Sequence, residues 1–264
     1  MLIGISLQLE AIANGVLTYG NAVHINDLFI SLIIGEDEEA ESILYSETGF
    51  EFYTLSFLMG KKPISGKLEI KEGEEYRVKF TFMNDKLFRS FYNAVIGYYR
   101  TGRTISIADT EFAIKKIRID KVFDFETILN AGRVNNGEFR LIFLSPTNFK
   151  LNGRYHMLPD IQYVLKSYAN KWNFLCPQGL EVTENRLEEI ASACFADKYR
   201  LNIEFFSIED IRIAGFKGQC HYKVKDEMEE EGIDTLSMLL NFSIFCGTGY
   251  KTALGMGRTM VRYR

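Results

Sequence analysis

Hydrophobic and polar positions alternate in several short runs of this chain, and apolar residues recur at helical spacing between those runs. Residues 75–82 are the clearest strand, because an apolar or aromatic side chain stands at every second position. Residues 21–34 and 85–95 instead repeat apolar side chains every three or four positions, which is typical of amphipathic helices. The chain therefore mixes strands and helices in both halves.

Each half gives a similar order of elements, roughly β-α-β-β-α-β. The first half has strands near 2–10, 52–58, 67–70, 75–82, 105 and 112–119, and helices near 21–34, 38–45 and 85–95. The second has strands near 139–144, 200–206, 211–216, 220–224 and 258–264, and helices near 161–172, 183–194 and 234–242. This order is that of the ferredoxin-like, RRM-like motif. We expect an α+β protein with two tandem ferredoxin-like domains.

The best candidate for a linker is Asn130–Gly137, which contains Asn135-Asn136-Gly137. It predicts an N-terminal domain over residues 1–130 and a C-terminal domain over 138–264.

Four glycines near the C-terminus form an array, Gly247, Gly249, Gly255 and Gly257, in which two G-x-G pairs enclose Lys251. A helix is expected before the array and a strand after it, which is the reverse of a dinucleotide-binding fingerprint. Gly-Lys-Ser/Thr is also missing, so a Walker loop is excluded. Glycines let a backbone approach a ligand closely, and successive N–H groups can bind an anion.

Charge near the array favours a polyanion as its ligand. No Asp or Glu follows Asp234, whereas Lys251 and Arg258 do follow it. The alternative is a flexible loop that merely precedes the last strand.

Composition sets limits on the function. The net charge of −4 argues mildly against nucleic acid binding, but the basic residues are clustered, for example at Lys115, Lys116 and Arg118. Four scattered cysteines without C-x-x-C spacing fit a reduced, cytoplasmic protein. No apolar run approaches the length of a membrane span, so no membrane association is expected. The acidic runs lack metal-ligand spacing, and no metal or cofactor is expected.

The glycine array with its internal lysine resembles that of the CRISPR repeat-processing endoribonucleases of the RAMP superfamily. Residues 43–49 followed by 52–56 look like the family's segment around its usual catalytic histidine, and Leu144-Ser145-Pro146 looks like the opening of its second domain. The resemblance implies tandem ferredoxin-like domains and metal-independent RNA cleavage. In that reaction a ribose 2′-OH attacks the adjacent phosphate and leaves a 2′,3′-cyclic phosphate.

The residues at the family's catalytic positions differ here. Gapless matching places Tyr45 at the usual histidine and Glu51 at the usual lysine. A phenol is a poor base at neutral pH, although it can orient a phosphate. His24, in the first turn of a helix that Asn21 could cap, is the substitute we expect for the catalytic base, with Tyr45 as auxiliary. The alternative is that His24 is an ordinary surface histidine.

Three further residues are weaker candidates for contact with RNA. Lys217 is expected in a hairpin between two strands, which approaches RNA in the family that the chain resembles. His221 lies on the polar face of a strand, and His156 is expected in a loop. Each has an alternative as an ordinary solvent-facing side chain.

We therefore predict an endoribonuclease that cuts CRISPR precursor RNA within each repeat. The predicted catalytic residues are His24 and Tyr45. The predicted RNA-binding residues are Gly247, Gly249, Lys251, Gly255, Gly257, Arg258 and Lys217. The expected partners are repeat RNA and CRISPR effector subunits, with the chain as monomer or homodimer. A non-catalytic RNA-binding RAMP subunit and an unrelated ferredoxin-like interaction domain are the alternatives.

Overall fold

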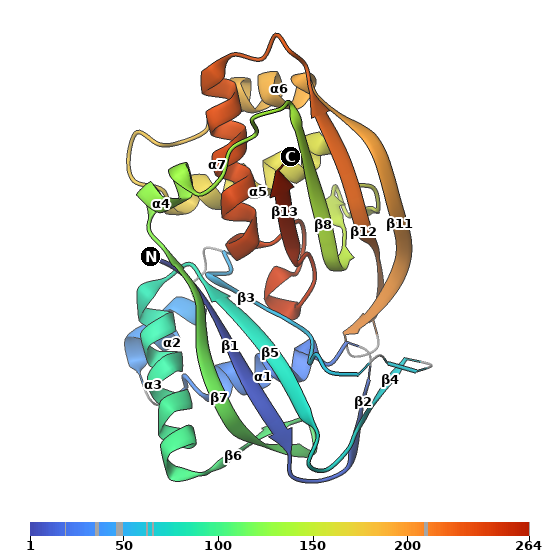
Figure 1. Ribbon diagram of the computed structural model, residues 1–264. Helices are drawn as coiled ribbons and strands as arrows, with labels where there is room; N and C mark the ends of the chain where they lie inside the picture. Colours follow the sequence, from blue (N-terminus) through green and yellow to red (C-terminus); the bar gives the residue numbers. More distant parts are fainter. Residues whose placement is uncertain are drawn as a thin grey trace. The chain divides into compact units, whose positions relative to one another are not determined.

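The computed structural model describes residues 1–18, 20–34, 37–45, 50–61, 63–64, 66–208 and 211–263. Two compact units divide the chain (Figure 1). The first contains Met1–Val122, Ser207–Ile211 and Ala253–Gly255, and the second contains Phe123–Phe206, Arg212–Thr252 and Met256–Arg264. Short pieces from the second half of the sequence, including the middle of the glycine array, thus belong to the first unit.

The first unit is a sheet with the strand order β3-β5-β1-β7-β6. Strands β1, β3, β5 and β7 with helices α1 and α3 reproduce the ferredoxin-like β-α-β-β-α-β order, which confirms the predicted fold class. Its elements are β1 (Leu2–Ala11), β2 (Gly15–Thr18), α1 (Ala22–Ser31), α2 (Glu38–Leu44), β3 (Tyr53–Leu55), β4 (Lys67–Ile70), β5 (Glu75–Phe82), α3 (Asp85–Thr101), β6 (Thr104–Ile107) and β7 (Thr110–Phe123).

Aromatic side chains fill the core between this sheet and its two long helices. Phe80 of β5 lies 5.9 Å from Phe29 of α1 and 4.6 Å from Phe91 of α3, measured between ring centroids. Because both helices contact the same strand residue, they cover the same face of the sheet. The alternation seen in residues 75–82 therefore correctly predicts the buried face of β5.

The second unit is a four-stranded sheet with the order β11-β12-β8-β13, again the ferredoxin-like arrangement. Helices α5 and α7 pack together, with Trp172 and Phe242 in edge-to-face contact at 5.4 Å. Its elements are α4 (Phe125–Asn130), β8 (Glu138–Thr147), β9 (Phe149–Leu151), β10 (Arg154–His156), α5 (Ile161–Leu175), α6 (Glu184–Ala193), β11 (Cys194–Ile208), β12 (Ile211–Val224), α7 (Glu230–Cys246), η1 (Thr252–Leu254) and β13 (Thr259–Tyr263).

Two local expectations are wrong. The predicted strands 211–216 and 220–224 form one strand, β12, with an irregularity between Phe216 and Gly218 in place of a hairpin. The irregularity is a register shift against β8, and Gly218, with φ +138°, also lies so close to Arg200 of β11 that a side chain would overlap the Arg200 carbonyl oxygen. Helix α7 begins at Glu230, one turn before the predicted start near residue 234.

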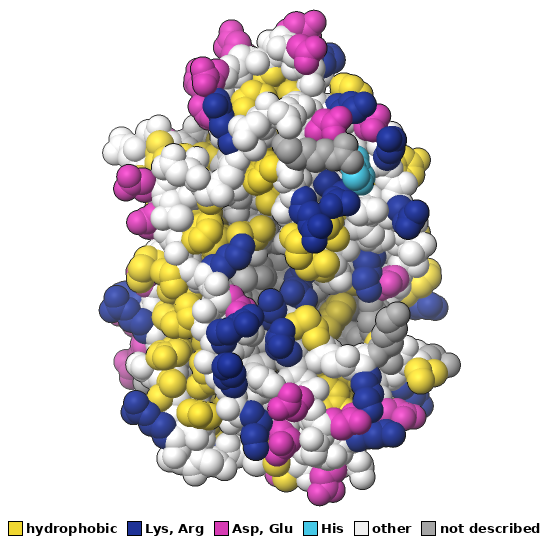
Figure 2. All heavy atoms as spheres, viewed as in Figure 1, with side chains coloured by type: hydrophobic (Ala, Val, Ile, Leu, Met, Phe, Trp, Pro, Cys, Tyr) yellow, Lys and Arg dark blue, Asp and Glu magenta, His cyan; other side chains and the backbone are white. Residues whose placement is uncertain are grey.

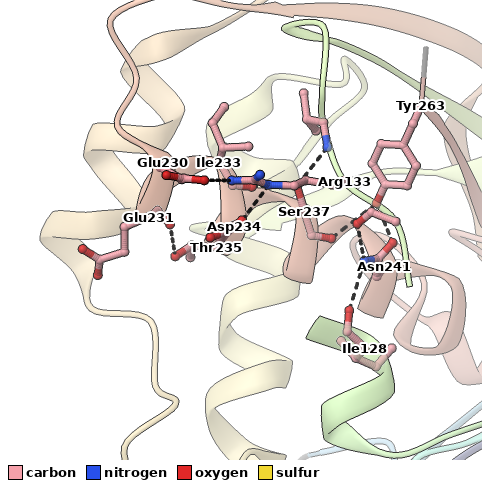
Figure 3. A network of polar contacts seen from close by, with 12 residues as sticks. Ile128, Arg133, Glu230, Glu231, Ile233, Asp234, Thr235, Ser237, Asn241 and Tyr263 are labelled. Atoms are coloured by element: carbon pink, nitrogen blue, oxygen red, sulfur yellow. Dashed lines mark hydrogen bonds and ion pairs between the residues drawn. The ribbon is translucent and has the colours of Figure 1, made fainter. Parts of the chain in front are cut away.

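The segment expected to be a linker is fastened to α7 (Figure 3). Arg133 forms ion pairs with Glu230 at 2.9 Å and with Asp234 at 2.8 Å. The carboxamide of Asn241 donates to the carbonyl oxygens of Ile128, at 3.0 Å, and Gly132, at 2.8 Å. Residues 125–134 therefore lie with the second unit. None of the helices in the described parts of the chain is long and apolar enough to cross a membrane.

We expect the Asn241 carboxamide to be a major determinant of stability in the second unit. Besides its two donated bonds, its oxygen accepts from the Tyr263 hydroxyl at 2.6 Å. Replacement by alanine leaves buried partners unsatisfied, so Asn241→Ala should lower the free energy of unfolding by about 3 kcal/mol. Urea unfolding measures this change. Asn170→Ala, at an exposed position of α5, is the matched control and should change it by less than about 0.5 kcal/mol.

Candidate functional site

The glycine array is a site of very close backbone packing. Gly247, Gly249, Gly255 and Gly257 all have positive φ, between +65° and +82°. A Cβ atom on Gly249 would overlap the carbonyl oxygen of Asn148, and one on Gly257 would overlap that of Thr248. Conformation and space thus both require glycine at these positions. The alternative of a loosely held loop before the last strand does not fit this packing.

Most backbone N–H groups of the array donate within the protein. Three of these bonds join the array to the β8–β9 segment or close the array on itself: Tyr250 N–H to Asn148 O at 3.0 Å, Gly257 N–H to Pro146 O at 3.0 Å, and Thr248 N–H to Gly257 O at 2.7 Å. The N–H groups of Gly249 and Arg258 donate to the hydroxyls of Ser167 and Ser145. These donors are satisfied here, so a phosphate at the array would be held mainly by side chains.

The middle of the array lies against helix α1. A Cβ atom on Gly255 would stand 2.7 Å from Ala22 Cβ and 2.8 Å from the ring of Phe57. The N–H of Ala253 donates to the carboxylate of Glu51 at 3.1 Å. Glu51, at the position where the resemblance implies a lysine, thus anchors the array. These contacts place Gly255 beside the first residue of α1, two positions before His24.

His24 lies in the first turn of α1, as predicted. Its side chain is 42% exposed, and its Nδ1 lies 3.9 Å from the carboxylate of Asp27 in the next turn. Asn21 precedes the helix but is not a side-chain cap, because its carboxamide oxygen accepts the N–H of Leu58 at 2.9 Å. Asn21 therefore ties the beginning of α1 to the segment after β3.

Tyr45 ends helix α2 and is 61% exposed, so its hydroxyl can reach a ligand in solvent. It lies within electrostatic reach of Tyr53 on β3, whose hydroxyl donates to the Asn26 carboxamide of α1 at 2.6 Å. Burial, with Glu51 and Tyr45 adding to it, raises the pKa of Tyr53 far above its usual value. Tyr53 therefore stays a neutral donor that joins β3 to α1. Residues 46–49, which the sequence comparison included, lie outside the described residues.

The predicted cationic residues differ in their surroundings. Lys251 has φ +55°, and its ammonium group lies 5.2 Å from the ring centroid of Tyr250. Arg258 is half-buried, and burial lowers the pKa of its guanidinium. Lys217 lies within β12, not in a hairpin, and forms an ion pair with Glu204 at 3.1 Å.

Basic side chains also line the polar face of each sheet (Figure 2). On the first sheet, a cavity of about 90 Å³ is lined by Ser6, Gln8, Arg77, Lys116 and Arg118. On the second, a cavity of about 320 Å³ includes Arg140, His221, Lys223 and Arg262 among its lining residues, with Glu138 and Asp197. Local positive charge thus occurs on a chain whose net charge is −4.

Asn148 is the residue at this site that the sequence analysis overlooked. Its carbonyl oxygen binds Tyr250 N–H and fills the space that a Gly249 side chain would need, and its carboxamide donates to Ala214 O at 2.7 Å. Asn148 follows the Leu144-Ser145-Pro146 motif by two residues, but nothing in the sequence pairs it with the distant array. A fully buried asparagine beside that motif is the anchor of the array.

Residues 141–259 match the family described as CRISPR-associated endoribonuclease Cas6. A Streptococcus thermophilus protein, described as CRISPR-associated endoribonuclease Cas6, is 32% identical over 148 residues. That match covers 54% of this chain and 57% of the relative, so it spans little more than half of the relative's length. Over these residues the chain is similar to the Cas6 endoribonucleases.

Solved structures extend the Cas6 likeness to the whole fold. A Cas6 product complex superposes with a TM-score of 0.79 at 20% identity and covers 99% of this chain and 100% of that chain. A RAMP protein described as binding different RNA substrates gives 0.68 at 16% identity, covering 98% and 99%. At this identity the likeness concerns the fold, and it confirms two tandem ferredoxin-like folds.

Close packing predicts a steep cost for any side chain within the array. Gly257→Ala adds the strain of positive φ to an overlap with Thr248, and should lower the free energy of unfolding by more than about 3 kcal/mol. Gly179→Ala is the control, because Gly179 also has positive φ, +90°, but an added Cβ meets nothing within 4 Å. It should cost about 1 kcal/mol. Equal costs in urea unfolding would contradict the packing explanation.

Proposed function

We propose that this chain is a metal-independent endoribonuclease that cuts CRISPR precursor RNA within its repeats. The similarity of residues 141–259 to the Cas6 family model supports the reaction class, since the matching relatives are described as endoribonucleases. The observation that carries the proposed site is the contact of Gly255 with Ala22, which brings the middle of the glycine array to the helix end that carries His24. Gly255 of the array therefore lies beside the first turn of α1, which carries His24, the histidine of the N-terminal half.

In the proposed reaction, His24 removes the proton from a ribose 2′-OH. The 2′-oxygen forms a bond to the adjacent phosphorus, the bond from phosphorus to the 5′-oxygen breaks, and that oxygen takes up a proton. The products are a 2′,3′-cyclic phosphate and a 5′-OH. His24 is exposed enough to reach the RNA, and imidazole exchanges protons readily near neutral pH.

Tyr45 is proposed to hydrogen-bond the scissile phosphate. Its exposed phenol at the end of α2 can donate to a non-bridging oxygen. Lys251 is proposed to bind a phosphate of the RNA, and Lys217 is a weaker candidate for such a contact because it already pairs with Glu204. The glycines Gly247, Gly249, Gly255 and Gly257 would shape this surface, and half-buried Arg258 would support it.

A non-catalytic RNA-binding subunit is the second candidate function. Tyr45 stands where the resemblance implies the catalytic histidine, and Asp27 lies near the His24 imidazole. The two candidates differ in cleavage and agree in repeat RNA binding. Contact with CRISPR effector subunits, a monomeric or homodimeric state and a reducing cytoplasmic location complete the proposal. The four cysteines, all free, are consistent with the last of these.

His24→Ala should slow single-turnover cleavage of repeat RNA by about 10²–10⁴-fold, the usual contribution of general acid–base catalysis. Affinity, measured on a substrate with 2′-deoxyribose at the cut site, should stay within a few-fold of the original. Tyr45→Phe removes one hydrogen bond and should slow the reaction by about tenfold. The matched control is Tyr99→Phe, at an exposed position of α3, with a cleavage rate close to that of the unaltered protein. Unchanged cleavage by His24→Ala would contradict the assignment of the base.

Lys251→Gln should weaken binding of repeat RNA uniformly and reduce the slope of log K against log salt by about 0.7 to 1, as expected for one lost phosphate contact. Lys217→Gln should reduce it less because of the ion pair with Glu204. Lys166→Gln, at an exposed position of α5, serves as the control for a general loss of positive charge. A slope that is the same for all three variants and the original protein would exclude Lys251 from phosphate binding.

A further inference from the structure

Two tyrosines and two lysines lie together beside the glycine array, on the second unit. Tyr155 of β10 lies 6.2 Å from Tyr250 of the array, between ring centroids, with the rings inclined by 39°. The ammonium groups of Lys150 and Lys251 each lie 5.2 Å from the Tyr250 ring centroid. We call these four residues the tyrosine platform. Only Lys251 of these four residues has a part in the function proposed above, as a ligand of an RNA phosphate.

The hairpin of β9 and β10 supplies one half of the platform. Strands β9 and β10 are joined by Asn152-Gly153, both with positive φ, the combination that a tight two-residue hairpin turn requires. Register places Tyr155 directly opposite Lys150, so the two side chains share a face of the hairpin. The hairpin thus presents an aromatic ring and a cation together.

The glycine array supplies the other half of the platform. The bond from Tyr250 N–H to Asn148 O, at 3.0 Å, holds the array against the first residues of β9. Gly249 permits this approach, because any side chain there would overlap the same oxygen. Part of the reason for glycine at position 249 is therefore the placement of Tyr250 beside the hairpin.

The charge and exposure of the platform indicate which kind of ligand it could bind. The segments 148–156 and 247–258 contain Lys150, Arg154, Lys251 and Arg258 and no Asp or Glu. Tyr155 is 40% exposed, and Lys150 is also exposed. Aromatic faces accept bases of any sequence by stacking, and neighbouring ammonium groups bind the phosphates on either side. A ligand that joins flat rings through phosphates fits this surface.

We infer that the tyrosine platform is a stacking site for an unpaired nucleobase of single-stranded RNA, with Lys150 and Lys251 on the flanking phosphates. The inference deepens the proposed function and rests on it for the identity of the RNA. The platform itself recognises base and phosphate without reading sequence. The platform would hold a single-stranded stretch of the substrate beside the array. This contact would fix the position of the rest of the repeat along the protein.

The test separates bases from phosphates. Binding is measured by fluorescence anisotropy with a labelled oligouridylate and with a strand of the same length made of abasic ribose phosphates. The unaltered protein should bind the oligouridylate about tenfold more tightly, as one stacked base provides. Tyr155→Ala and Tyr250→Leu should each abolish most of that preference and leave binding of the abasic strand unchanged. Tyr250→Phe should retain it. Lys150→Gln should weaken both strands alike.

Tyr99→Ala, at an exposed position of helix α3 in the first unit, is the matched control and should behave like the unaltered protein. Equal binding of both strands by the unaltered protein, or an equal loss on both strands in the tyrosine variants, would overturn the inference. Cleavage of repeat RNA by the unaltered protein is measured in parallel. Cleavage without base preference rejects the platform alone, whereas base preference lost with the tyrosines but without cleavage supports the platform and rejects the proposed function.

Discussion

The site depends on one constraint, the approach of the glycine array to the backbone around Asn148. Gly249 and Gly257 lie so close to carbonyl oxygens that no side chain fits, and the N–H groups of Tyr250 and Gly257 bond to the β8–β9 segment. The array consequently has a defined shape, which fixes where Lys251 and Tyr250 lie. Residues Ala253–Gly255 belong to the first unit, where Ala253 N–H donates to Glu51 and Gly255 packs against Ala22.

This packing changes the meaning of a glycine-rich loop. Glycines in such a pattern suggest a flexible strand of N–H groups that wraps a phosphate. Here the principal N–H groups are already bonded, so the glycines act by letting backbones meet and by directing the neighbouring side chains. We propose that this region binds phosphate through Lys251 and Lys150 more than through Lys217, because Lys217 forms an ion pair with Glu204.

The sequence predicted the fold well because each sheet buries one face, and alternation such as that of residues 75–82 reports this directly. Predictions from local sequence were wrong where a residue distant in the sequence contacts the residue in question. Asp234 has the chemistry of a helix cap, yet Arg133 pairs with it and α7 begins a turn earlier. Lys217 was expected in a hairpin, but it lies in a continuous strand whose register against β8 shifts between Phe216 and Gly218. The partners of the array, Asn148 and Glu51, lie about 100 and 200 positions away in the chain, beyond what local spacing can reveal.

The proposed function is the cleavage of RNA through a 2′-hydroxyl without a metal. End-group analysis of repeat RNA incubated with the protein in excess chelator tests it most directly. The account predicts cleavage within the repeat, with a 2′,3′-cyclic phosphate on the upstream fragment and a 5′-OH on the downstream fragment. Fragments with a 3′-OH and a 5′-phosphate, or RNA that is bound but left intact, would contradict it.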